Sequence, residues 1–97
     1  MKLSKANKKV VARMIESMIF NYEIAARKNA NCPRLPSHFN YSADHHLGLA
    51  QGMQSAIELI LMENKCYNGF RVAVKKVNGV EFNYNHYFLD FDYENFL

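Results

Sequence analysis

The stretch that decides the fold runs from Phe70 to Tyr87 and reads FRVAVKKVNGVEFNYNHY. On both sides of Asn78 and Gly79, apolar and polar residues alternate, which is the pattern of a β-strand with one face in the core. An Asn-Gly pair between two such runs is the strongest short signal for a tight turn. The sequence therefore predicts an antiparallel β-hairpin.

The register of this hairpin depends on the length of its loop. A two-residue loop of Asn78 and Gly79 would place Val74 opposite Asn83 and would mix apolar and amide side chains on both faces. A three-residue loop, with Gly79 in a left-handed bulge, makes one face apolar, and we expect this register. Its pairs are Val74 with Phe82, Val72 with Tyr84 and Phe70 with His86 on the apolar face, and Lys75 with Glu81, Ala73 with Asn83 and Arg71 with Asn85 on the other.

Two helices are predicted before the hairpin. Ser4 is a suitable N-cap, and apolar residues then recur at three- and four-residue spacing, which indicates a helix over 5–29. Pro33 and Pro36 end this helix, because proline lacks a backbone donor and disfavours helix in the residue before it. A second helix, with Ser42 as its expected N-cap, ends near residue 64 and packs on the first. The expected fold is α+β: two packed amphipathic helices followed by a C-terminal antiparallel β-hairpin.

Length and composition predict one soluble domain spanning residues 1–97. A chain of 97 residues buries enough surface for one modest core. No run approaches the roughly 20 apolar residues of a membrane span, and no signal-peptide core follows the basic start. The formal net charge is +3, with eight basic and two acidic residues up to Arg34 and a balance of −3 beyond it. Such asymmetry is typical of a solvated helix start or of a polyanion-binding end.

No motif points to catalysis, to a metal or to a cofactor. Cys32 and Cys66 are too few for a disulfide framework and are expected to be unrelated reduced thiols. The segment 32–46 gathers a thiol, three imidazoles and a carboxylate, but its spacing matches no standard zinc site. Ser37 and His38 have no nucleophile elbow behind them, and a phosphate-binding glycine loop is missing from the sequence. We therefore expect a protein that is not an enzyme.

A ligand site is the alternative interpretation of the segment 34–46. Cations and flat rings there lead into a helix N-terminus, where backbone amides and the helix dipole attract anions such as phosphates. The candidate residues are Arg34, His38, Phe39, Tyr41, His45 and His46. The competing interpretation is that the two aromatic residues fix the loop on the core while the histidines are solvated.

The C-terminal tail is the candidate partner-binding surface. It mixes aromatic residues, which often anchor protein interfaces, with acids. The candidate residues are Asp90, Phe91, Asp92, Tyr93, Glu94 and Phe96. With so many apolar groups, the tail either packs back on the helices or docks on another chain.

Two glycines in the second helix indicate a close approach of another backbone. Gly48 and Gly52 lie four residues apart on one helix face, and each costs about 1 kcal/mol of helix stability relative to alanine. One explanation is the seam of a homodimer. The other is that the first helix crosses the second at this point, with Ala25 or Ala26 opposite.

As a whole, the chain resembles the short accessory proteins of bacteriophages, including anti-CRISPR proteins. The resemblance lies in its start at Met1, its length, its richness in Lys, Asn, Tyr and Phe, and its helix-helix-hairpin order without a catalytic motif. It implies a non-enzymatic inhibitor in the host cytoplasm that binds and occludes a host defence complex such as a CRISPR-Cas effector. The alternative that it implies is a nucleic-acid binder or a sponge for a cyclic nucleotide, which would use the loop 34–46.

Overall fold

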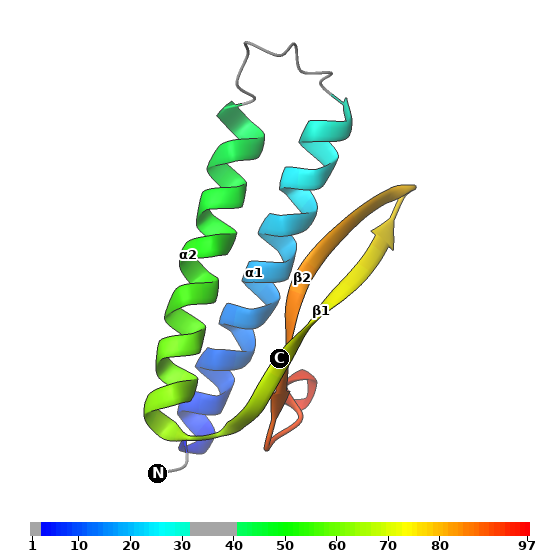
Figure 1. The fold of residues 1–97 in the computed structure, drawn as a ribbon. Helices are drawn as coiled ribbons and strands as arrows, with labels where there is room; N and C mark the ends of the chain where they lie inside the picture. The colour runs from blue at the N-terminus through cyan, green and yellow to red at the C-terminus, as the bar shows by residue number, and fades with distance from the viewer. Residues whose placement is uncertain (1–2, 32–40) are drawn as a thin grey trace.

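The computed structural model describes residues 3–31 and 41–97, and it confirms the predicted α+β fold. Two antiparallel helices form one layer, and the hairpin lies along the first of them, with its second strand on the helix side (Figure 1). The elements in chain order are α1 (Lys5–Asn31), α2 (Tyr41–Asn64), β1 (Tyr67–Val77), β2 (Val80–Leu89) and the short 3-10 helix η1 (Tyr93–Phe96).

Local chemistry accounts for the helix boundaries. The Ser4 hydroxyl accepts the backbone N–H of Asn7 at 3.2 Å, which confirms Ser4 as the cap of α1. This helix continues to Asn31, because Pro33 disfavours helical backbone mainly in the residue directly before it. Helix α2 begins at Tyr41, two residues earlier than an N-cap at Ser42 would imply, so Ser42 lies in its first turn and not at its cap.

A left-handed residue ends α2 and turns the chain into the hairpin. Lys65 has a φ of 50°, and its N–H donates to the Met62 carbonyl at 3.4 Å, while the Cys66 N–H donates to the Leu61 carbonyl, also at 3.4 Å. These two bonds form a Schellman motif, which satisfies carbonyls that the helix leaves free. Strand β1 therefore starts directly at the end of α2.

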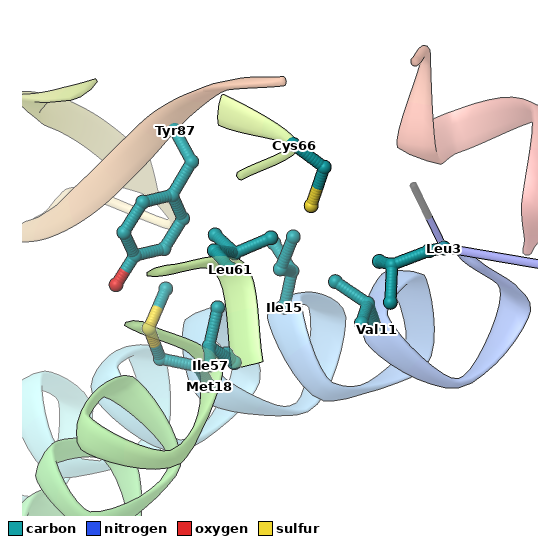
Figure 2. Close-up of a cluster of buried hydrophobic side chains, with 8 residues drawn as sticks. All are labelled: Leu3, Val11, Ile15, Met18, Ile57, Leu61, Cys66 and Tyr87. Carbon is teal, nitrogen blue, oxygen red and sulfur yellow. The ribbon is translucent and has the colours of Figure 1, made fainter. Parts of the chain in front are cut away.

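The core lies where the hairpin joins the helix pair. On each helix, buried residues recur every seven positions and so lie on one face, which packs against the other helix. Met18 of α1 and Ile57 of α2 are fully buried in this way. Toward the connection between the helices the buried residues are small, as at Ala25 and Ala43. Figure 2 shows the cluster of large buried side chains at the other end: Leu3, Val11, Ile15, Met18, Ile57, Leu61, Cys66 and Tyr87.

The expected register of the hairpin is wrong. Val77 pairs with Val80 and Val74 with Asn83, so the loop has two residues. Asn78 and Gly79 have φ values of 53° and 81°, the two positive angles of a type I′ turn, whose twist matches that of the strands. The only register shift in β1 lies between Tyr67 and Phe70, where Gly69 has a φ of 125°.

Twist explains why a register with mixed faces is nevertheless stable. Phe82 and Tyr87 are the two buried residues of β2, at 6% and 4% exposure. They lie five residues apart and therefore belong to opposite faces of the strand. A two-stranded ribbon twists strongly, so β2 turns one face inward near the turn and the other near its C-terminal end. Neither face needs to be apolar along its whole length.

The tail folds back beside the N-terminal half of α1 and ends in η1 (Figure 1). None of the helices within 3–31 and 41–97 is long and apolar enough to cross a membrane.

Candidate functional site

The predicted partner-binding tail packs against its own chain. Phe91 and Tyr93 contact the core cluster, and the Lys8 ammonium lies 5.3 Å from the centre of the Phe91 ring. The rings of Phe91 and Phe96 meet edge to face, with 5.6 Å between their centroids. The three acids of the tail are exposed: Asp90, Asp92 and Glu94. The tail thus follows the first of its two expected arrangements, and most of its aromatic surface is already used within the chain.

The alternative ligand site lies mostly outside the described residues. Arg34, His38 and Phe39 belong to the segment 32–40, and the side chain of Tyr41 is also outside them. The remaining members of that set, His45 and His46, lie in the first turns of α2.

His46 holds the two helices together. Its Nδ1 lies 2.8 Å from Oδ1 of Asn21, a buried residue of α1. The Asn21 amide nitrogen donates to the Ser17 carbonyl at 2.8 Å, so Oδ1 is the acceptor and the histidine Nδ1 is the donor. His45 is exposed, and its ring meets that of His46 edge to face. A structural role is therefore visible for His46.

Cys66 is a packed thiol in the core cluster, as Figure 2 shows. It is fully buried, and burial raises its thiol pKa, with a smaller contribution in the same direction from Asp90. A raised pKa keeps the sulfur protonated at neutral pH, whereas a nucleophilic cysteine needs the thiolate. Cys32 lies outside the described residues.

Gly48 and Gly52 lie on the outer face of α2, away from α1. A Cβ added to either glycine would meet nothing within 4 Å among the residues that the structure describes. The explanation by a close crossing of the two helices is therefore wrong. The residues that α2 buries against α1 include Ala50 and Ile57, and Gly52 lies on the opposite side of the helix from both.

Sequence reasoning missed a row of apolar side chains on β1. Phe70, Val72 and Val74 are 53%, 61% and 61% exposed and project from the same face of the strand. We call these three residues the hairpin row. The wrong register had placed them in the core, opposite His86, Tyr84 and Phe82. The Asn-Gly signal, taken with its usual two-residue loop, would have given the correct register, but not the exposure of these three side chains.

The outer edge of β1 is unpaired in the described part of the chain. The sheet there has two strands, so β1 bonds to β2 along one edge only. In a two-residue hairpin the closing pair exchanges both backbone bonds, so Val77, Lys75 and Ala73 bond to β2. Val72 and Val74 alternate with them and direct their N–H and C=O groups outward. The hairpin row thus coincides with the residues whose backbone groups are free.

The tip of the hairpin stands away from the helices. A hollow of about 580 Å³ lies between the turn and the C-terminal half of α1, lined by Gly79 and Val80 on one side and by Tyr22, Ala25 and Ala26 on the other. Strand β1 lies on the outside of this arrangement (Figure 1). Its row and its edge are therefore accessible together.

The charges of β1 have one sign. The strand carries Arg71, Lys75 and Lys76 and no acid. Arg71 lies 5.7 Å from the centre of the Phe88 ring, on the face opposite the hairpin row. Lys75 lies on that opposite face too, whereas Lys76 lies on the same face as the row, next to the turn. Beside Phe70, Val72 and Val74 the edge is therefore apolar on one face and cationic on the other, which determines the kind of segment that can pair with it.

In the ranges 3–31 and 41–97, no three His, Cys, Asp or Glu side chains lie close enough together to hold a metal ion. Comparisons with family models, with curated proteins and with solved structures gave no match. The candidate site, the hairpin row with the free edge of β1, therefore rests on the geometry of this chain.

Proposed function

We propose that the protein is a non-enzymatic interaction protein that binds a protein partner along β1. Its free edge receives an extended segment of the partner, and the hairpin row covers that segment on one face. In this proposal the protein is a phage-type inhibitor, and the partner belongs to a host defence complex such as a CRISPR-Cas effector, which the bound protein occludes. The observation that carries the proposal is the coincidence of unpaired backbone groups and exposed apolar side chains at Val72 and Val74.

Strand addition supplies both affinity and specificity. Main-chain bonds form along the edge, and alternate side chains fit into the partner's surface. Full burial of a Val or Phe side chain contributes about 1.5–3 kcal/mol, and the row is slightly more than half exposed, so covering it contributes about 3–5 kcal/mol before ordering costs. An edge that is left open would instead be a site of aggregation.

The partner segment is defined by the two faces of β1. Next to Phe70, Val72 and Val74 it needs apolar side chains. On the other face, Arg71 and Lys75 favour acidic side chains at alternate positions, because opposite charges directly across a strand pair stabilise it. We therefore propose a segment that alternates apolar and acidic residues.

The test is protection of a phage from a CRISPR-Cas effector in cells that produce this protein. The informative variant is Val72→Lys, which places a charge in the row and leaves the bonds between β1 and β2 intact. Its matched control is Val10→Lys, the same change at a position of α1 that is 54% exposed. We expect phage plating to rise with the wild-type protein and with Val10→Lys, and to fall to the level of the empty vector with Val72→Lys.

Equal protection by both variants would contradict the assignment of the site. No protection by the wild-type protein against effectors of different types would contradict the proposed target. Purified protein distinguishes the nucleic-acid alternative, since binding to a polyanion weakens steeply with added salt, whereas apolar strand docking does not.

A further inference from the structure

A second exposed surface runs along the outer face of α2. Six exposed residues follow one another at alternating spacings of three and four: His45, Gly48, Gly52, Ser55, Leu59 and Met62. This spacing places the six residues in one row along the helix, at the positions that a helix uses for contacts with another helix, and we call this row the seam. The inner face of α2 is already occupied by α1, so the outer face is a separate seam.

This face lacks the charges of an ordinary solvent-facing helix. Between Gly48 and Met62 none of the exposed residues of α2 is charged. Leu59 and Met62 are 62% and 61% exposed, and Leu49 beside the seam is 43% exposed. The exposed face of α1, in contrast, carries Lys5, Lys9 and Arg13. A helix face that meets only water normally carries charged or polar residues, as α1 does.

We infer that this face packs against the same face of a second copy of the chain, with the two α2 helices antiparallel. One half of the seam has no side chains, at Gly48 and Gly52, and the other half has two bulky ones, at Leu59 and Met62. A two-fold axis between residues 52 and 55 places Leu59 of each copy over Gly48 of the other. A parallel pair would stack leucine on leucine and leave a gap at the glycines.

The ends of the seam are also complementary in this arrangement. When Leu59 lies over Gly48, Glu63 of one copy lies beside His45 of the other, and both residues are exposed within one chain. A carboxylate and an imidazole can pair there. Asp44, the acid next to His45, is half-buried and already interacts within its own chain. A two-fold interface forms each of these contacts twice.

The first test is the mass of the full chain in solution, measured by light scattering at micromolar concentration. The wild-type protein is expected at twice its chain mass of 11.3 kDa. Gly52→Gln is expected to be a monomer, because its side chain fills the space that the second copy needs, while its Cβ meets nothing within 4 Å among the described residues of its own chain. Ala6→Gln, at an exposed position of α1, is the matched control and stays dimeric.

A monomeric wild-type protein would overturn the inference, and so would a Gly52→Gln protein that remains a dimer. Orientation is tested by oxidative cross-linking in a Cys32→Ser background. Gly48→Cys combined with Leu59→Cys is expected to link the two copies. Leu59→Cys alone is not, because antiparallel packing separates the two copies of position 59 by about 16 Å at 1.5 Å per residue. Efficient linkage through Leu59→Cys alone would refute the antiparallel arrangement.

Discussion

Truncating Leu61 and Leu59 separately to alanine tests the orientation of α2, on which both exposed surfaces depend. Leu61 is fully buried and Leu59 is 62% exposed, two residues further back on the same helix. The change removes three carbons, worth about 0.8 kcal/mol each when buried, and a cavity adds to the loss at Leu61. We expect Leu61→Ala to lower the free energy of unfolding by about 2.5–5 kcal/mol and Leu59→Ala by about 0.5 kcal/mol or less.

Urea denaturation followed by circular dichroism measures both values. A domain of this size has a total stability of about 5–15 kcal/mol, so the loss at Leu61 is easily resolved. The samples are diluted until the unfolding midpoint no longer depends on concentration, because a dimer through α2 would add stability that Leu59→Ala removes. Equal losses under those conditions, or a larger loss at Leu59, would refute the assigned orientation of α2.

Three further predictions concern the hairpin. Val74→Pro should keep the fold, because the N–H that it loses points away from β2, whereas Ala73→Pro removes a bond to β2 and should unfold the hairpin. Circular dichroism measures both variants, and the opposite order of stability would contradict the register. Gly79→Val should cost more than about 1 kcal/mol in urea denaturation, because Gly79 has a φ of 81°, and an unchanged stability would contradict the type I′ turn. Burial raises the pKa of Tyr87 above its ordinary value of 10.0, and the Glu58 carboxylate, whose oxygen lies 3.1 Å from the Tyr87 hydroxyl, raises this pKa further. The folded state therefore holds the Tyr87 proton more tightly than the unfolded state does, so the free energy of unfolding should fall as the pH rises above about 10. This fall should be less steep in Tyr87→Phe, and an equal fall in both proteins would contradict the raised pKa.

The helices and the existence of the hairpin were predictable because their signals are local. Three- and four-residue spacing, the Ser4 cap and the Asn78-Gly79 turn each act within a few residues. The register of the hairpin was not predicted correctly, because the expectation assumed a flat hairpin with one buried face. The burial of both Phe82 and Tyr87 shows that twist brings each face inward in turn. A sheet of only two strands, which twists strongly along its length, does not need a single apolar face.

The two exposed surfaces differ in how much the sequence reveals of them. The outward direction of Gly52 follows from Ala50 and Ile57, which face α1, so the helical spacing alone was enough to find it. The accessibility of the hairpin row was not predictable, because it depends on which strand lies against α1. Tertiary packing determines which strand lies against α1. Strand β2 carries Tyr87, whose ring belongs to the core cluster (Figure 2), and β1 therefore lies on the outside.

The most direct test of the proposed function is residue-resolved amide hydrogen exchange of β1, in the free protein and with the effector complex that we propose as its target. In the free protein we predict rapid exchange at Val72 and Val74 and slow exchange at Ala73 and Lys75, whose N–H groups bond to β2. In the complex we predict that Val72 and Val74 become protected, because a partner strand then accepts their N–H groups. Unchanged exchange at Val72 and Val74 in a stable complex would contradict strand docking on β1.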